Sequence, residues 1–398
     1  MADTSSPAPE LPVNRSAEGA AGVFSRLARP RTGQSVWVTL ASSLAAVVLA
    51  MLIGGLLLLI TGKSPVDAFS KIVDAGFTPV KLAEAVQRAT PLIIAAVAVA
   101  IGFKMNLFNI GVEGQFLMGM FWAAVVGAYV DLPPVLHVSL CLVVAMAAGA
   151  LWSGIAAVLK VKRGVNEVIA TIMLNSIALS VLDWLFNDFF RHETPGNLDV
   201  RTKPLPSSAW MPTLFTVTSK TGRATTRTEV TSFLLIALVV VLLFWLIVYK
   251  SKFGFRLRAS GYNAVAARTA GISSNRMIVI AMLLSGAVAG LAGLPSLLSD
   301  THSYGPTRPD GYGFNGIAVA LLGRNHPAGI IISALLWGFL DAVAGPLQIA
   351  KIPSSIILVI KAIILITVVI VNEVVGRRMA KRTADRTAAQ LAMPVVAA

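Results

Sequence analysis

An all-α, polytopic membrane fold is predicted by three features of this 398-residue sequence: its composition, its long apolar runs and the placement of its basic residues. Hydrophobic residues make up 56% of the chain and charged residues 13%, whereas soluble domains carry roughly 25% charged residues. The apolar runs are continuous and do not alternate, so they fit membrane helices better than the strands of a transmembrane barrel. We therefore expect a transmembrane helical bundle.

Ten apolar segments recur along the chain and predict about ten spans. The first is too long for the apolar part of a signal peptide, and no small-residue cleavage site follows it. Two others are short for a membrane span, namely the run before Asn106 and the run from Gly313 to Gly323. The ten segments are 36–61, 88–104, 111–130, 135–159, 165–186, 231–249, 275–297, 312–323, 327–345 and 353–374.

Basic residues predict the orientation of these spans. They gather in the N-terminal tail, at Lys160–Arg163, at Lys250–Arg276 and in the C-terminal tail. Lys and Arg are enriched in cytoplasmic loops of membrane proteins, and ten spans place all four clusters on that side. Both termini are therefore expected in the cytoplasm, and the long polar loop 187–230 outside it.

The same patterns divide the chain into three parts. Residues 1–35 are rich in Pro, Ser and Ala and predict a disordered, basic cytoplasmic tail. Residues 36–375 form the transmembrane domain, with an extracytoplasmic loop at 187–230 and a cytoplasmic loop at 250–275. Residues 376–398 form a second basic cytoplasmic tail. We assign the net charge of +14 to topology and to membrane lipid, and we expect no nucleic acid partner.

Two similar breaks interrupt the apolar pattern. Phe108–Gly111 reads Phe-Asn-Ile-Gly and opens the third segment, and Phe314–Ile317 reads Phe-Asn-Gly-Ile and opens the eighth. Segments an odd number apart cross the bilayer in opposite directions, which predicts an inverted repeat with broken helices. Irregular backbone at membrane depth is tolerated where it faces protein or a water-filled cavity, and paired breaks indicate a transport path. A chance match is the alternative.

Polar and aromatic residues in or near the spans are the candidates for lining that path. A carboxylate in hydrocarbon costs on the order of a few kcal/mol unless it is paired or hydrated, and amides offer donors and acceptors to a neutral solute. The alternative for the polar residues is hydrogen bonding between helices, and Asn166 and Glu167 also suit a helix cap. The candidates are Phe108, Asn109, Glu113, Gln115, Asn166, Glu167, Asn175, Phe314 and Asn315.

Catalytic, metal and nucleotide sites have little support in the sequence. Residues 61–64 resemble the end of a phosphate-binding loop, but Leu57 stands where that motif needs glycine. Cys141 is the single cysteine and the four histidines are scattered, so no metal pattern is present. We expect a protein that is not an enzyme and has no cofactor of its own. Any ATP that drives it is expected on another chain.

The cytoplasmic loop contains an Ala-rich stretch bracketed by Gly261 and Gly271. Small side chains let another protein approach closely, and the glycines free the backbone at both ends. Arginines beside them suit phosphates or carboxylates of a partner or of lipid. An ordinary amphipathic loop is the alternative. The predicted docking residues are Arg256, Arg258, Gly261, Asn263, Ala266, Ala267, Arg268 and Gly271.

Taken together, these motifs resemble ABC importer permeases. Residues 261–272 are similar to the ATPase-docking loop of those proteins. Residues 108–115, 164–175 and 313–323 are similar to signatures of the ribose/branched-chain amino acid permease superfamily, in its nucleoside and simple-sugar subgroup. The resemblance covers about residues 36–375, and it marks them as a transmembrane permease domain.

This resemblance implies a multi-pass permease of a bacterial plasma membrane that imports nucleosides or simple sugars. It implies ATP-binding cassette ATPase subunits on the cytoplasmic side, a second permease subunit and an extracytoplasmic substrate-binding lipoprotein. The N-terminal extension resembles the larger of two non-identical permeases, so a heterodimer is expected.

Two other functions remain open from the sequence. An ion-coupled secondary transporter would share the inverted repeat and would use Glu113 or Glu167 as its proton site. The docking loop, together with the lack of a central Asp/His relay, counts against it. A scaffold protein would need no broken segments, so the two breaks count against that function.

Overall fold

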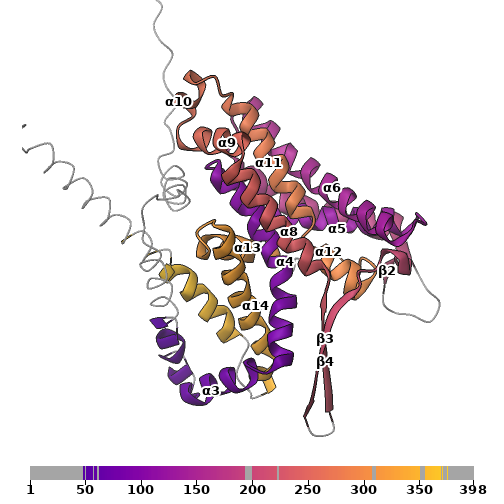
Figure 1. The fold of residues 1–398 in the computed structure, drawn as a ribbon, viewed down its shortest axis with the longest axis vertical. Helices are drawn as coiled ribbons and strands as arrows, with labels where there is room; N and C mark the ends of the chain where they lie inside the picture. The colour runs from indigo at the N-terminus through magenta and orange to yellow at the C-terminus, as the bar shows by residue number, and fades with distance from the viewer. Residues whose placement is uncertain are drawn as a thin grey trace, which may run out of the picture.

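The computed structural model describes residues 48–374, apart from 50, 57, 61, 193–199, 222–223, 307–310, 350–354, 369 and 371–373. These residues form a bundle of helices with two small antiparallel sheets (Figure 1). The predicted tails 1–35 and 376–398, and the first residues of the first span, lie outside the described part of the chain.

Six of the described helices are long and apolar enough to cross a membrane. The polytopic helical bundle predicted from composition is confirmed, and each of the ten predicted segments contains an apolar helix. The long ones are α4 (Pro79–Lys104), α6 (Pro134–Arg163), α7 (Glu167–Leu185) with η1 (Phe186–Phe190), α8 (Phe233–Trp245) with η3 (Leu246–Lys250), α11 (Ser274–Gly290) with α12 (Leu294–Ser296) and η4 (Leu297–Thr301), and α14 (Pro327–Ile349). The shorter ones are Met51–Ile60, α5 (Val112–Ala128), α13 (Tyr312–Leu322) and Ser355–Val368.

Helix α4 is longer than the sequence suggested. The predicted segment 88–104 was short, but the helix has 26 residues and begins at Pro79. Thr78 caps it, and Glu84 pairs with Lys81 and Arg88 at 2.5 and 2.7 Å. Pairs three and four residues apart stabilise a helix, so the polar first turns continue into the apolar run.

The amphipathic helix α3 (Pro65–Gly76) was not predicted. Its N-cap is Ser64, whose hydroxyl accepts a hydrogen bond from Asp67 N at 3.3 Å. Ser64 is the last residue of the run that resembles a phosphate-binding loop, and in the structure it serves this helix.

The segment between α7 and α8 contains strands, so the all-α prediction holds for the bundle but not for this segment. β1 (Arg191–His192) pairs with β2 (Arg201–Thr202), and η2 (Ser207–Ala209) follows. β3 (Thr213–Thr221) pairs with β4 (Ala224–Thr231) in a hairpin that projects from the bundle (Figure 1). Threonines recur along both strands of the hairpin, and β-branched residues favour strands.

Buried His137 on α6 attaches this segment to the bundle. One ring nitrogen lies 2.9 Å from the Ser208 hydroxyl and the other lies 2.9 Å from the carbonyl oxygen of Gly127. The side chain therefore joins η2 to α5 and α6.

The helices pack in a crossed arrangement. Helix α4 lies against α13 and α14, and α11 lies against α5 and α6. Glycines allow the second contact, since a Cβ atom on either Gly149 or Gly286 would collide with the backbone oxygen of the other. Small residues at helix crossings let backbones approach closely in membranes.

We predict that Gly149→Ala destabilises the protein by about 1–3 kcal/mol, because the added methyl would overpack the α6–α11 crossing. The measurement is the thermal unfolding midpoint in detergent. Gly345→Ala is the matched control, since a Cβ atom there has nothing within 4 Å. Equal midpoints for the two variants would contradict the close crossing.

Candidate functional site

The two broken helices α5 and α13 begin at the same place. Glu113, in the first turn of α5, is buried, and its carboxylate accepts hydrogen bonds from Gly311 N and Gly313 N, each at 2.7 Å. These N–H groups open α13 and have no partner within their own helix. A negative charge is favourable at a helix N-terminus. Glu113 therefore joins the two helices at their N-terminal ends.

Gly313 is required at this junction. A Cβ atom there would lie 2.5 Å from the backbone nitrogen of Glu113. Gly311 has a φ of 75°, a conformation that glycine adopts without strain. The two glycines before Phe314 thus allow the backbone of α13 to reach the carboxylate.

Asn109 and Gln115 stabilise the turn that precedes α5. Asn109 Nδ2 donates to Gln115 Oε1 at 2.9 Å and to Ser285 Oγ at 2.8 Å. Asn109 Oδ1 accepts from Gly111 N at 3.0 Å and from Gln115 Nε2 at 2.9 Å. Both amides are buried, and all of the hydrogen-bonding capacity of Asn109 is used within the protein.

Helix α7 supports the same turn with two side chains one helical turn apart. Asn175 Oδ1 accepts from Gly114 N and its Nδ2 donates to the Ile110 carbonyl, both at 2.9 Å. Thr171 Oγ1 accepts from Ile110 N at 3.3 Å. The sequence analysis identified Asn175 but missed Thr171. Its spacing of four residues from Asn175 was the available signal, because such residues share a helix face.

Asn166 and Glu167 lie at the start of α7, away from this network. Asn166 Oδ1 accepts from Val168 N at 2.8 Å, so it caps the helix. Glu167 pairs with Lys160 at 2.5 Å. The capping alternative is therefore the one that the structure supports for Asn166.

The second break has a more open environment than the first. Phe314 is 57% exposed, and Asn315 beside it is partly exposed. Asn315 Oδ1 accepts a hydrogen bond from Trp337 Nε1 at 3.1 Å. Phe108, at the first break, is partly buried, and the centre of its ring lies 4.8 Å from the centre of the Phe103 ring.

An ion pair near Asn315 was not predicted. Lys361 Nζ lies 2.6 Å from Asp341 Oδ1 and 5.6 Å from the centre of the Trp337 ring. Asp341 is the only charge in the predicted segment 327–345, and Lys361 lies in the middle of the segment 353–374. Both were usable signals, since charges within membrane helices are expensive and usually paired.

The predicted docking loop folds as two short helices, α9 (Lys252–Tyr262) and α10 (Ala264–Thr269). Asn263 caps α10 by accepting from Val265 N and Ala266 N at 2.9 and 3.1 Å. Gly271 ends the loop with a φ of 77°. Two predicted docking residues therefore have structural roles: Asn263 caps α10, and Gly271 allows the turn that ends the loop.

Only part of the predicted docking set faces outward. Ala267 is buried, with 3% of its surface exposed, so it packs within the chain. Arg256, Ala266 and Arg268 are exposed and Arg258 is partly buried. Val265, with 62% of its surface exposed, was not predicted. The exposed apolar side chains of the loop are Phe255, Tyr262 and Val265.

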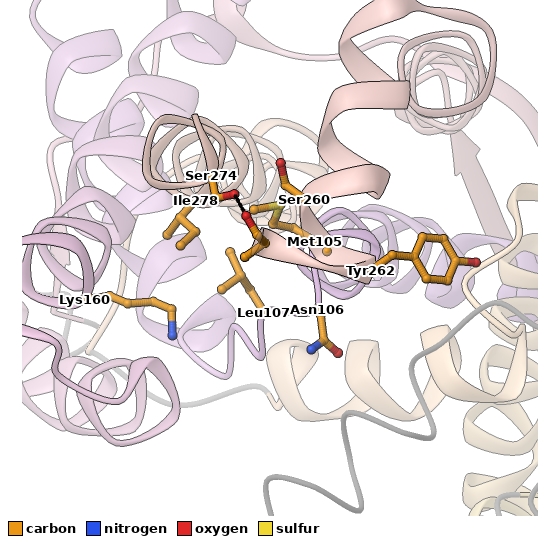
Figure 2. A pocket seen from close by; sticks show the side chains of 10 residues that line it. Met105, Asn106, Leu107, Lys160, Ser260, Tyr262, Ser274 and Ile278 are labelled. Carbon is orange, nitrogen blue, oxygen red and sulfur yellow. Dashed lines mark hydrogen bonds between the residues drawn. The ribbon is translucent and has the colours of Figure 1, made fainter. Parts of the chain in front are cut away.

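Gly261 brings the docking loop against the end of α4. A Cβ atom there would lie 2.7 Å from the Lys104 carbonyl oxygen and 2.8 Å from the carbonyl carbon of Met105. A cavity of about 270 Å³ lies beside this contact. Figure 2 shows Asn106, Leu107 and Lys160 around it, with Tyr262 pointing away. The loop is thus in direct contact with the turn that leads to Asn109.

A second contact joins the docking loop to the end of α13 through Tyr249. The charged groups of Arg258 and Lys104 lie 5.5 and 5.0 Å from the Tyr249 ring centre. The Tyr249 hydroxyl donates to the Asn325 carbonyl at 3.2 Å. His326 lies beside the ring, and burial together with the nearby Lys104 cation lowers its pKa. The loop therefore lies against the end of α4, which leads to the turn before α5, and is linked through Tyr249 to the turn after α13.

In the described part of the chain, no group of three or more His, Cys, Asp or Glu side chains could hold a metal ion. What the site does contain is a buried polar network that stabilises two helix ends and two contacts that join them to an exposed loop. Such an arrangement can transmit a movement of the loop to the helix ends.

Comparison with known proteins identifies relatives over most of the chain. A family model described as the permease component of a branched-chain amino acid transport system matches residues 82–391. The guanosine ABC transporter permease NupP of Bacillus subtilis is 36% identical over 329 residues, which are 82% of this chain and 91% of that protein.

Two further relatives are named as permeases for nucleosides and for glucose. The nucleoside ABC transporter permease NupB of Lactococcus lactis is 32% identical over 334 residues, or 81% of this chain and 88% of that protein. The glucose ABC transporter permease TsgB13 of Haloferax volcanii is 30% identical over 339 residues, or 85% of this chain and 89% of that protein. No solved structure matches this chain.

We predict that Glu113→Ala lowers the free energy of unfolding by about 3 kcal/mol or more, because two buried N–H groups lose a charged acceptor. Glu84→Ala is the control, since its partly exposed ion pairs contribute about 1 kcal/mol or less. Denaturant unfolding in detergent measures both. Similar losses for the two variants would contradict the bridging role of Glu113.

Proposed function

The chain belongs to the family of permease components of branched-chain amino acid transport systems, and from this membership we propose that it imports nucleosides or related simple sugars. The protein is a multi-pass permease of the cell membrane in an ABC transporter and not an enzyme. As such, it works with ATPase and substrate-binding partners. The resemblance predicted from its motifs is confirmed.

The proposed solute class rests on the relatives, which are named as transporters of guanosine, nucleosides and glucose. The chemistry at the breaks supports a neutral polar solute. Among the described residues named at the junction of α5 and α13, Glu113 carries the only charge, and backbone N–H groups stabilise that negative charge. A phosphorylated solute would require basic groups there.

We further propose that the chain has about ten spans, both termini in the cytoplasm, and an inverted repeat with broken helices. The crossed packing supports this repeat. If α4, α5 and α6 correspond to α11, α13 and α14, then the first helix of each half packs on the second and third helices of the other half. The meeting of α5 and α13 at Glu113 fits the same correspondence.

The solute path, in this proposal, runs along the face that carries Phe314 and Asn315, between this chain and a second permease. Of the predicted path residues at the second break, both reach the surface, whereas Asn109, Glu113 and Gln115 at the first break are buried. We propose a heterodimer, an extracytoplasmic substrate-binding lipoprotein and ATP bound by the ATPase subunits. The domain limits 36–375 and the loops 187–230 and 250–275 are part of the same proposal.

Coupling to ATP would begin at the docking loop. Closure of the ATPases would move α9 and α10, whose contact at Gly261 lies against the end of α4. The contact through Tyr249 lies against the turn after α13. A single movement of the loop would thus reach both broken helices.

An ion-coupled mechanism loses support because its two candidate proton sites are engaged. Both Glu113 oxygens accept backbone hydrogen bonds, and Glu167 pairs with Lys160.

The complex purified through a tag on this chain, reconstituted in proteoliposomes, tests the proposed function. We expect a second permease and an ATPase to co-purify, and we expect labelled guanosine or glucose to accumulate with ATP. Uptake that is independent of ATP and collapses with an ionophore would overturn the proposal.

We predict that Val265→Glu lowers ATP-dependent uptake at least about tenfold, because a desolvated carboxylate at a docking surface costs well over 1.4 kcal/mol. The matched control is Val165→Glu, at a valine that is 36% exposed in the turn between α6 and α7. Uptake is measured alongside the amount of protein in the membrane. Equal activity of both variants would exclude α10 as the docking surface.

A further inference from the structure

The side-chain amide of Asn315 has a defined orientation. Trp337 Nε1 lies 3.1 Å from the Asn315 side chain, and an indole N–H can only donate a hydrogen bond. The atom that faces it must be the amide oxygen, so the Nδ2 donor points the other way. The donor–acceptor chemistry therefore decides between the two possible flips.

Trp337 packs beside an ion pair of a buried Lys361 and a partly exposed Asp341. The indole is 2% exposed and Lys361 is 6% exposed. Lys361 Nζ lies 5.6 Å from the indole ring centre and 2.6 Å from Asp341 Oδ1. A desolvated cation over an indole is a favourable contact. Asp341 lies one helical turn after Trp337 on α14, so both partners of Lys361 share one face of that helix.

The Nδ2 donor of Asn315 has no hydrogen-bond partner among the residues that the structure describes. The side chain is partly exposed next to Phe314, which is 57% exposed. An unbonded amide donor is costly in hydrocarbon, and a polar cavity or a polar ligand at this position would satisfy it. Asn109, at the matching break, differs because both of its side-chain atoms are fully bonded within the chain.

We propose that Asn315 determines solute specificity by donating a hydrogen bond from Nδ2 to an acceptor atom of the transported solute. Trp337, Lys361 and Asp341 are positioning residues that keep this donor turned toward the path. The proposal rests on the proposed function and adds the requirement that a solute carries an oxygen or nitrogen acceptor at this point.

The test measures KM and maximal rate of ATP-dependent guanosine and glucose uptake by the reconstituted complex. Asn315→Asp keeps an acceptor for Trp337 but removes the donor, so we expect KM for the transported solute to rise about five- to tenfold, the usual range for one lost hydrogen bond. Asn315→Ala is a second variant that introduces no charge, and its expected rise is similar.

Trp337→Phe keeps an aromatic ring for Lys361 but frees the amide to flip. We expect KM to rise about threefold, because the donor then faces the path only part of the time. In the Asn315→Ala background the same change should have no added effect, since Trp337 acts through Asn315. The matched control is Trp184→Phe, at a tryptophan that is 55% exposed on α7, with unchanged KM.

Three results would overturn the inference. The first is an unchanged KM in both Asn315 variants. The second is an additive effect of Trp337→Phe in the Asn315→Ala background, which indicates a general packing role. The third is loss of the co-purifying second permease in both Asn315 variants, which places the donor at a protein contact. A wild-type complex that transports neither solute would overturn the proposed function and this inference together, whereas the three results leave the proposed function intact.

Discussion

The Glu113 carboxylate provides the hydrogen-bond acceptors that allow α13 to begin inside the bundle. Backbone N–H groups at a helix start have no partner in their own helix, and no water replaces one in the hydrocarbon region. Glu113 accepts from two of them, at Gly311 and Gly313, while its own helix starts from a turn supported by Asn109, Thr171 and Asn175. The Glu113 charge and the two helix ends therefore stabilise one another. They lie where α5 meets α13, within the crossed packing of α4 on α13 and α14 and of α11 on α5 and α6.

Two contacts join the surroundings of these helix ends to the loop formed by α9 and α10. Gly261 lies against the backbone at the end of α4, and Tyr249 joins Arg258 to the turn after α13. Both contacts are close. At Gly261 backbone packs against backbone, and at Tyr249 a hydrogen bond is combined with a cation over the aromatic ring. A movement of α9 and α10 would consequently act on the end of α4, before α5, and on the turn after α13. Such a coupling suits a permease that is driven by the ATPase of another chain.

The sequence predicted the bundle, the breaks and most polar residues at them because a polar group in an apolar run is costly and therefore visible. It did not distinguish Asn109 from Asn315, since their environments depend on side chains of other helices, Ser285 on α11 and Trp337 on α14. The inward face of Ala267 and the start of α4 at Pro79 likewise depend on packing and pairing. The β3–β4 hairpin was not predicted, because its threonine-rich strands are mostly polar and carry little apolar alternation.

The difference between the two asparagines bears on how an inverted repeat can serve a directional transporter. Similar motifs open α5 and α13, yet the first amide uses both of its atoms to stabilise its own turn, while the second has its oxygen bound and its nitrogen without a partner among the described residues. A fully bonded amide cannot bind a solute without breaking internal hydrogen bonds, whereas a half-bonded one can do so at little internal cost. In the proposed inverted repeat, the two halves would supply two similar helix ends, and the neighbours of each asparagine would decide which end supports the fold and which contacts solute.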